Sequence, residues 1–193
     1  MRPTALISGA SRGIGAATAQ LLAGKGFRLA LLARNEADLH SVASSCGLGP
    51  ADCLLLPTDL SLPLEIQQAA ERALQHFGGI SVLINNAGIG HFGPIENLHW
   101  QQLQAMLAVN VLGSWTLTQA LLPSMKVRQQ GIIVNVLSDA AKRSFSGGTA
   151  YCASKFAQEG LFSALRNEVN HNQIKICNLY PGLVNSYFNN KTP

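Results

Sequence analysis

Charged residues are scarce in this chain of 193 residues, at 12% of the sequence against about a quarter in an average soluble protein. Hydrophobic residues make up 47%, a balance that suits a parallel sheet buried on both faces and favours a partner subunit over part of the surface. The formal charge is only +4 and no run of lysine and arginine occurs. The composition therefore argues against a nucleic-acid-binding tract.

Other absences narrow the setting of the protein. No apolar run reaches the ~18 residues that a membrane span needs, and glycines with Arg12 interrupt any signal peptide at the N-terminus. The five histidines form no ligand cluster, so we expect no catalytic metal. Together these absences predict a single cytoplasmic domain over residues 1–193, without a membrane partner. Four scattered cysteines without metal-type spacing predict buried free thiols in a reducing compartment: Cys46, Cys53, Cys152 and Cys177.

Short apolar runs alternate with stretches of helical spacing along the whole sequence. Strands separated by segments of helix length predict an α/β fold with a doubly wound parallel sheet in three layers, α/β/α. The apolar runs are 5–7, 29–33, 53–56, 82–84, 132–137 and 174–179, and the helical stretches are about 14–25, 36–45, 63–77, 97–128 and 149–170.

Tyr151 and Lys155 lie four residues apart in a helical stretch, so their side chains share one helix face. Ser138 lies upstream, at the end of an apolar run. A cation beside a phenol lowers its pKa from near ~10, and a serine can hold a carbonyl oxygen while the tyrosine transfers its proton. The alternative is an ordinary helix pair and a loop hydroxyl, because Tyr-x-x-x-Lys is a common pattern.

Glycines follow the first apolar run, at Gly9, Gly13 and Gly15, directly before a helical stretch. A glycine-rich turn between a strand and a helix lets the backbone approach a pyrophosphate, whose charge is bound by the free N–H groups of the helix. The spacing differs from the common dinucleotide fingerprint. A glycine-rich turn without a ligand is the alternative.

The second apolar run is followed by Arg34, where dinucleotide folds that bind NAD place an acidic residue. A guanidinium there accommodates a 2′-phosphate, and Arg12 in the glycine turn can contact the same phosphate. We therefore predict NADP(H) in preference to NAD(H). Glu36 favours NAD(H) instead, since it lies at about the right distance along the chain to contact a ribose. The alternative for Arg34 is a solvated surface arginine, and for Arg12 a cation at the start of a helix.

Six motifs together resemble the short-chain dehydrogenase/reductase family in order and spacing, over essentially the whole chain. The resemblance is to the single-domain type of roughly 250 residues, whose substrate-covering segment, last helix and seventh strand are absent from this sequence. It implies a Rossmann fold and an NADP(H)-dependent oxidoreductase that interconverts a small-molecule carbonyl and a secondary alcohol. The motifs are Gly9-x-x-x-Gly13-x-Gly15, Asn85-Asn86-Ala87-Gly88, Asn110, Ser138, Tyr151-x-x-x-Lys155 and Pro181-Gly182.

The resemblance also implies roles for single residues. Tyr151 would be the general acid in reduction and the base in oxidation, and Ser138 would fix the substrate oxygen. Lys155 would bind the nicotinamide ribose, and Asn110 would relay protons to it through a water, unless Asn110 is a buried amide that satisfies the backbone. Asp59 would bind near the adenine or else cap the next helix. The expected cofactor-binding residues are Gly9, Ser11, Arg12, Gly13, Ile14, Gly15, Arg34, Asp59, Leu60, Asn86, Ala87, Gly88, Tyr151, Lys155, Pro181, Gly182 and Val184.

The helical stretches 97–128 and 149–170 carry more apolar residues than one buried stripe needs, which predicts a homodimer or homotetramer built on them. Two other functions compete with the oxidoreductase. The intact Ser138, Tyr151 and Lys155 favour the oxidoreductase over a dinucleotide-binding sensor without turnover, which the short C-terminus keeps open as the alternative. A sugar-nucleotide epimerase is disfavoured by the glycine spacing and the length. The substrate stays open among sugars, steroids, acyl-carrier ketones and quinones.

Overall fold

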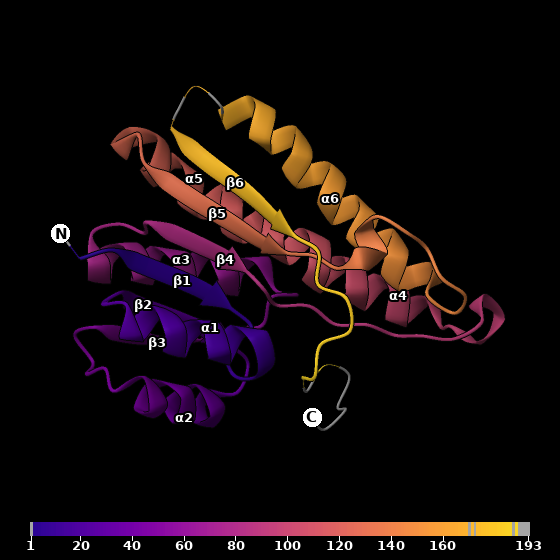
Figure 1. The fold of residues 1–193 in the computed structure, drawn as a ribbon, viewed down its shortest axis with the longest axis horizontal. Coiled ribbons are helices and arrows are strands. Elements are labelled where there is room, and N and C mark those ends of the chain that lie inside the picture. Colours follow the sequence, from indigo (N-terminus) through magenta and orange to yellow (C-terminus); the bar gives the residue numbers. More distant parts are fainter. Residues whose placement is uncertain (1, 170, 172, 187, 189–193) are drawn as a thin grey trace.

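The computed structural model describes residues 2–169, 171, 173–186 and 188. Six parallel strands form one sheet in the order β3-β2-β1-β4-β5-β6 (Figure 1). The predicted doubly wound parallel sheet is confirmed, and every strand lies within one residue of its predicted bounds. The strands are β1 (Thr4–Ser8), β2 (Arg28–Ala33), β3 (Cys53–Pro57), β4 (Val82–Asn85), β5 (Gly131–Val136) and β6 (Ile174–Leu179).

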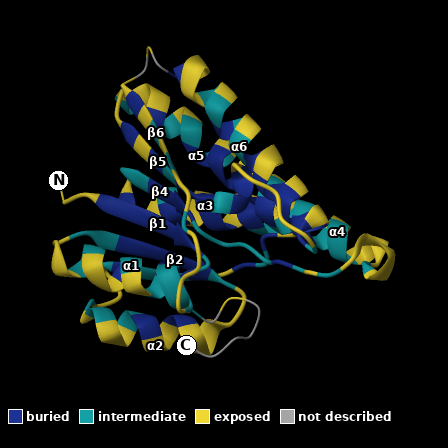
Figure 2. Cartoon of the chain, turned by 45° about the vertical axis from the view of Figure 1, so that its right-hand side comes forward, coloured by how far each residue is buried: buried dark blue, intermediate teal, exposed yellow. Residues whose placement is uncertain are grey.

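Helices cover both faces of the sheet, because successive strand residues point to opposite sides. Ala5 and Ile7 pack with α1 (Gly13–Gly24) and α2 (Glu36–Cys46). Leu6, between them, packs in the opposite core with α3 (Pro63–Phe77), α5 (Ser114–Arg128) and α6 (Thr149–Val169). Figure 2 shows the resulting pattern, with buried strands between helices whose outer sides are exposed.

The predicted helix over 97–128 is interrupted in the structure. It consists of α4 (Trp100–Met106), the π-helical turn η2 (Leu107–Gly113) and α5, and a short 3-10 helix, η1 (Ile95–Asn97), precedes it. The Ser114 hydroxyl lies 2.8 Å from the carbonyl oxygen of Asn110 and 2.9 Å from that of Val111. Isolated π turns of this kind occur frequently at functional sites, and this one contains Asn110.

The same helical stretch, Trp100–Arg128, is long and apolar enough by length and composition to cross a membrane. The sequence criterion of a continuous apolar run did not single it out, because polar residues interrupt it. In its most apolar window, 44% of the residues are buried inside the fold. The core helix of a soluble protein meets the same criterion, so this finding is weak evidence for a membrane span.

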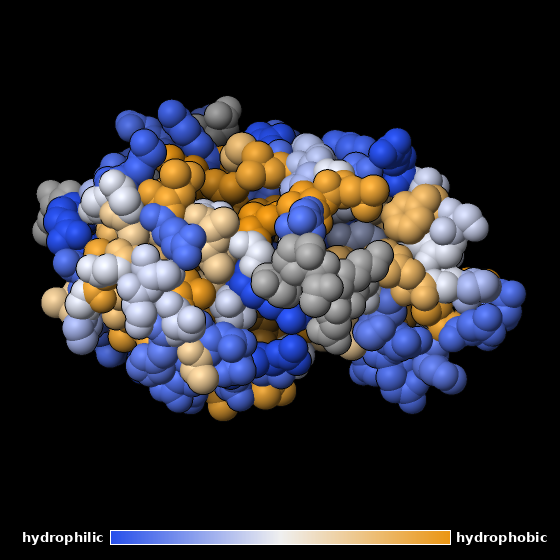
Figure 3. All heavy atoms as spheres, turned by 60° about the horizontal axis from the view of Figure 1, so that its bottom comes forward, coloured by the Kyte–Doolittle hydropathy of each residue, from blue (hydrophilic) through white to orange (hydrophobic). Residues whose placement is uncertain are grey.

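One part of the sheet has an exposed apolar face. Ile132 of β5 and Leu179 of β6 lie on the side of α1 and are 40% and 45% exposed, and no described helix covers them. Figure 3 shows hydrophobic atoms gathered on one face of the molecule. All four cysteines are free, as predicted, but Cys177 of β6 is exposed rather than buried.

Candidate active site

The strands all run in one direction, so the turns that follow them meet at the carboxyl edge of the sheet. β1 lies beside β4, and the chain turns outward from this pair in both directions. Open parallel sheets bind ligands outside such a switch point. The predicted site residues follow β1, β2, β3, β4, β5 and β6 in turn, and this topology places them along one edge.

The glycine turn after β1 packs tightly against the segment after β4. A Cβ on Gly9, whose φ is +65°, would lie 2.8 Å from the Cα of Ala87, and a Cβ on Gly15 would overlap the carbonyl oxygen of Gly9. The Asn86 side chain donates hydrogen bonds of 3.0 Å to the carbonyls of Ser8 and Gly9. The glycines are required by close approach of the backbone, and Asn86 holds the two turns together.

The start of α1 fits an anionic group. Arg12 precedes the helix and makes no side-chain hydrogen bond to its first turn, so the N–H groups there lack a capping side chain. Gly13 and Gly15 flank Ile14, so no side chain from these two positions covers the first N–H groups of the helix. Gly13 adopts a φ of +56°, and a Cβ added to it would lie 3.4 Å from the Cβ of Ser186 in the C-terminal segment. The residues present therefore suit a pyrophosphate at a helix N-terminus.

The residues expected around an adenosine lie after β2 and β3. Arg34 is exposed, and like Arg12 it forms no ion pair with another described residue. Burial would raise the pKa of Asp59, but the backbone N–H and hydroxyl of Ser61, each 2.8 Å away, and the nearby Arg34 lower it below its usual value. Asp59 stays ionised and closes the turn ahead of α3. Asp59 does not cap α3, whose N-cap residue is Leu62 without a side-chain hydrogen bond, and Arg34 lies close to the Asp59 carboxylate.

Tyr151 and Ser138 lie together at the ends of α6 and β5. Tyr151 is 8% exposed and Ser138 9%. Ser138 begins the 3-10 helix η3 (Asp139–Ala141), where its Oγ accepts a 3.1 Å hydrogen bond from the Ala140 N–H. Burial raises the pKa of Tyr151, the Ser138 hydroxyl opposes that rise, and the charge of Asp139 adds to it. The phenol is therefore protonated at neutral pH.

Lys155 does not lower the pKa of Tyr151 in this arrangement, contrary to the prediction. Its Nζ lies 6.0 Å from the centre of the Tyr151 ring and donates to the Val136 carbonyl (3.2 Å) and the Gln158 side-chain oxygen (3.1 Å). Loss of water on burial instead raises the pKa of the phenol. Lys155 is itself 3% exposed, and burial lowers its pKa to about 8.

Asn110 is fully buried in η2, and its amide is engaged by neighbouring groups. Its oxygen accepts from the Ile89 N–H at 2.8 Å, and its nitrogen donates to the Ile89 carbonyl at 2.9 Å and to Ser154 Oγ at 3.0 Å. These are the contacts of the buried-amide alternative. A Cβ on Gly88 would lie 3.4 Å from the Asn110 oxygen and 3.6 Å from Lys155 Nζ, so the segment after β4 runs beside both side chains.

This geometry agrees with the comparison to known protein families. The family model for short chain dehydrogenases matches residues 3–193. The chain belongs to the short-chain dehydrogenase family.

Two kinds of relative show the extent of the similarity. The chain is 37% identical to mouse dehydrogenase/reductase SDR family member 7 over 185 residues, which are 93% of this chain but 55% of the relative. It therefore spans about half the length of that protein. An alcohol dehydrogenase from Thermococcus sibiricus, complexed with 5-hydroxy-NADP, superposes with a TM-score of 0.91 at 32% identity. The match covers 100% of this chain and 81% of the alcohol dehydrogenase. A Burkholderia phymatum short-chain dehydrogenase/reductase complexed with NAD superposes with a TM-score of 0.92 at 28% identity. That match covers 96% of this chain and 67% of the Burkholderia protein.

Aromatic rings surround the phenol of this short-chain dehydrogenase. The centre of the Tyr151 ring lies 5.1 Å from that of Phe92 and 5.9 Å from that of Phe188, and Phe145 lies 6.1 Å from Phe92. The three phenylalanines are 36% to 48% exposed. They come from the segments after β4, β5 and β6, so an apolar rim borders the protonated phenol.

The C-terminal segment of the short-chain dehydrogenase is anchored to the sheet and to α6. The Pro181 carbonyl accepts a 3.0 Å hydrogen bond from the Asp139 N–H, while Gly182 and Val184 beyond it are exposed. Ser11 and Ile14 are half-buried in the first turn, and Leu60 is buried against Gly113. The sequence-predicted residues thus lie along one edge, where Asn86 contacts Gly9 and Gly88 lies beside Asn110 and Lys155.

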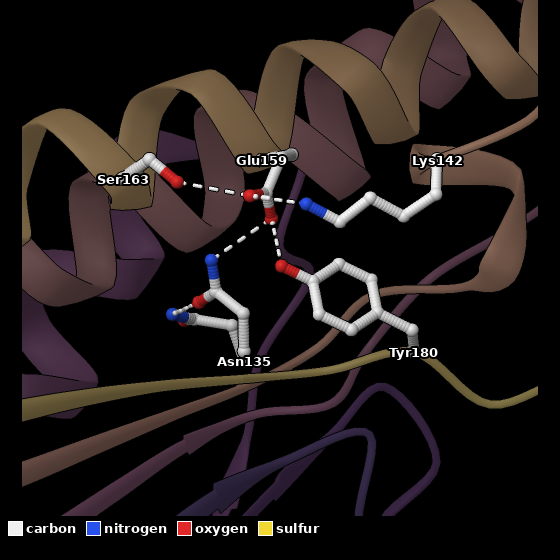
Figure 4. A network of polar contacts seen from close by, with 6 residues as sticks. Asn135, Lys142, Glu159, Ser163 and Tyr180 are labelled. Carbon is white, nitrogen blue, oxygen red and sulfur yellow. Dashed lines mark hydrogen bonds and ion pairs between the residues drawn. The ribbon is translucent and has the colours of Figure 1, made fainter.

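Sequence reasoning missed a polar network around Glu159, one turn beyond Lys155 (Figure 4). Its carboxylate accepts hydrogen bonds from Tyr180 (2.6 Å), Asn178 (2.9 Å), Lys142 (3.0 Å) and Ser163 (2.9 Å). Burial raises the pKa of Glu159, but these donors outweigh it and lower the pKa to about 2. The network fixes the end of β6 against α6. A side-chain amide ladder continues it across the sheet through Asn178, Asn135 and Asn85.

Sequence reasoning also missed the buried polar residues that adjoin the predicted ones. Ser154, Ser114 and Gln158 are buried and contact Asn110 or Lys155. The contact between Gln158 and Lys155 could have been predicted from their spacing, since residues three apart on a helix are neighbours.

Proposed function

We propose that the chain is an NADP(H)-dependent oxidoreductase that interconverts a small-molecule carbonyl and a secondary alcohol, with Tyr151 as general acid and base. The observation that carries the proposal is that Ser138 lies with Tyr151, while Lys155 lies beside Gly88 in the segment that packs on the glycine turn. Family membership supports it, and so do the structural neighbours that are complexed with nicotinamide dinucleotides.

The residues divide the work of such a reaction. A bound nicotinamide would supply or accept the hydride. The N–H groups at the start of α1 would hold the pyrophosphate, and Lys155 would bind ribose hydroxyls through its ammonium. Ser138 Oγ would turn from Asp139 to donate a hydrogen bond to the substrate oxygen. Tyr151 would then donate its phenolic proton to that oxygen in reduction and recover a proton from the alcohol in oxidation.

Tyr151 can act as the proton donor in reduction at neutral pH. Its raised pKa keeps the phenol protonated, which is the form that can donate to a carbonyl. The apolar rim of Phe92, Phe145 and Phe188 favours a carbonyl compound with an apolar body over a sugar. Turnover is tested by following the absorbance of the reduced nicotinamide with a panel of aryl, alkyl and sugar carbonyls. A protein that binds NADPH but turns over no carbonyl would favour the dinucleotide-binding sensor.

We expect NADPH to bind more tightly than NADH, because Arg12 and Arg34 are exposed, form no ion pair within 4 Å among the described residues, and can contact the 2′-phosphate. Replacing Arg34 by Asp should remove one contact and repel the phosphate, shrinking the preference by about tenfold or more, since a charge-assisted hydrogen bond contributes ~1.5–3 kcal/mol. Calorimetric titration with both cofactors measures the ratio.

The matched control is Arg72→Asp, which makes the same charge change on α3, away from the glycine turn. It should leave the ratio of the two affinities at the parental value. Equal affinities for NADPH and NADH in the parent protein would contradict the assignment of the two arginines.

We also propose a homodimer built on α4, η2, α5 and α6. Trp100, Leu112, Trp115 and Phe156 lie on these helices and are 45% to 68% exposed, and large aromatic side chains of this kind are enriched at interfaces. Light scattering at micromolar concentration should give twice the chain mass of 20.5 kDa or a higher multiple. Trp115→Glu should shift the mass toward the monomer, whereas Val127→Glu, at a still more exposed position of α5, should not. A monomeric parent protein would contradict the proposal.

A further inference from the structure

Gln158 is a polar residue in the core that the proposed mechanism does not use. It lies on α6, and its side chain is completely buried. Buried amides carry two donors and an acceptor that need partners. Its Oε1 accepts a 3.1 Å hydrogen bond from Lys155 Nζ, and its Nε2 donates to Ser114 Oγ at 3.4 Å.

Ser114 continues this chain of contacts into the π turn. Its hydroxyl lies 2.8 Å from the carbonyl oxygen of Asn110 and 2.9 Å from that of Val111. Gln158 therefore connects the ammonium of Lys155 on α6 to the backbone of η2, through side chains alone. The contact joins two elements that also meet through Asn110 and Ser154.

The titratable groups near Lys155 are neutral or are bound to other partners. On α6, Tyr151 has a raised pKa and is neutral, and Glu159 binds Lys142 and Tyr180 instead. On η3, Asp139 pairs with Arg143 at 2.7 Å. From β5, the Val136 carbonyl is the second acceptor of Lys155 Nζ.

The remaining elements around Lys155 are η2 and the segment after β4. They contribute the amide of Asn110 and the backbone of Gly88, both uncharged. Among the described residues, the Gln158 oxygen is thus the only side-chain acceptor bonded to this ammonium. Its loss would leave the buried charge with a single backbone partner.

We propose that Gln158 is a positioning residue that holds Lys155 in place and in its charged form, so that the ammonium faces the ribose site and Tyr151. The consequence for turnover rests on the proposed function, but the effect on Lys155 does not. An acceptor bonded to an ammonium stabilises the charged form. Removing it should therefore lower the pKa of Lys155, and replacing it by a carboxylate should raise that pKa.

The first test titrates Lys155 directly, in the full chain with lysine labelled at Cε and Nζ for NMR, and with the signal assigned through Lys155→Arg. The parent Lys155 has a pKa of about 8. In Gln158→Met, which keeps the side-chain length without the amide, the pKa should fall by about one unit or more. In Gln158→Glu it should rise above the parental value. An unchanged Lys155 titration in either folded variant would overturn the proposal.

Two controls separate positioning from a general effect on the core. Ser114→Ala removes the anchor of the Gln158 nitrogen but keeps the acceptor oxygen, so its shift should be smaller than that of Gln158→Met. Ser163 lies on the same helix and its hydroxyl donates to Glu159, so Lys155 should titrate in Ser163→Ala as in the parent. A shift in Ser163→Ala as large as in Gln158→Met would overturn the proposal.

The second test reads the same effect in turnover. The high-pH limit of the rate should move to lower pH in Gln158→Met and to higher pH in Gln158→Glu. A purely structural role would lower the rate at every pH without moving that limit, and this result would overturn the proposal. If no carbonyl is turned over by the parent, the proposed function fails while the NMR titration still decides the role of Gln158. If Gln158→Met does not fold, Gln158→Glu provides the decision.

Discussion

Tyr151→Phe is expected to lower the turnover number by about a thousandfold, while NADPH affinity stays within about twofold of the parental value. General acid-base catalysis contributes roughly 10²–10⁴ to a rate, and the substitution removes the only atom that carries the proton. The ring itself, which packs between Phe92 and Phe188, is kept. Steady-state rates and calorimetry on the same preparation measure the two quantities.

Tyr180→Phe is the matched control for this substitution. It removes another phenolic hydroxyl, the one that donates to Glu159 at 2.6 Å. It should reduce thermal stability, because Glu159 loses one of its donors, and it should retain most of the turnover. A Tyr151→Phe protein that works at the parental rate on an active substrate would disprove the acid-base assignment.

Lys155→Ala is expected to lower both turnover and cofactor affinity, since the ammonium would bind the ribose and so orient the nicotinamide for hydride transfer. We expect a loss of about tenfold or more in affinity, the effect of ~1.5–3 kcal/mol for a hydrogen bond to a charged group, and a larger loss in rate. Lys155→Met fills the space of the parent side chain and distinguishes loss of charge from loss of packing. Lys142→Ala, a surface lysine bound to Glu159, should leave NADPH affinity unchanged.

The pH dependence of the parent protein gives the sign of the Lys155 effect. Its pKa is lowered by burial to about 8, so the ammonium is present below this pH and is lost as the pH rises through it. Cofactor affinity should therefore decline above about pH 8, and Lys155→Met should show no such decline. An affinity that rises with pH through this range in the parent would contradict the role of the ammonium.

Most of the fold could be predicted because its signals are local. Apolar runs such as 29–33 and 174–179 are bounded by glycine or polar residues, and each became a strand buried on one or both faces. Gly9 and Gly15 were recognisable because the turn cannot hold a side chain there. The edge at which Ser138, Tyr151 and Lys155 meet follows from the parallel topology, which the alternation of strands and helices predicts.

The remaining features depend on contacts that the spacing of residues does not reveal. The π turn around Asn110 is held partly by a hydroxyl of Ser114, and the length of the helical stretch gave no sign of it. The expected lowering of the Tyr151 pKa was wrong, because burial raises this pKa and Lys155 Nζ lies 6.0 Å from the centre of the ring. Gln158, which accepts a hydrogen bond from the Lys155 ammonium, belongs to none of the recognised motifs.

The central claim is that Tyr151 protonates a carbonyl that receives a hydride from NADPH. The most direct measurement follows NADPH absorbance for the parent chain and Tyr151→Phe side by side, with a panel of carbonyl compounds. The account predicts NADPH consumption matched by alcohol formation in the parent, with both absent or reduced about a thousandfold in Tyr151→Phe. Binding of NADPH by both proteins without carbonyl-dependent consumption in the parent would contradict the account.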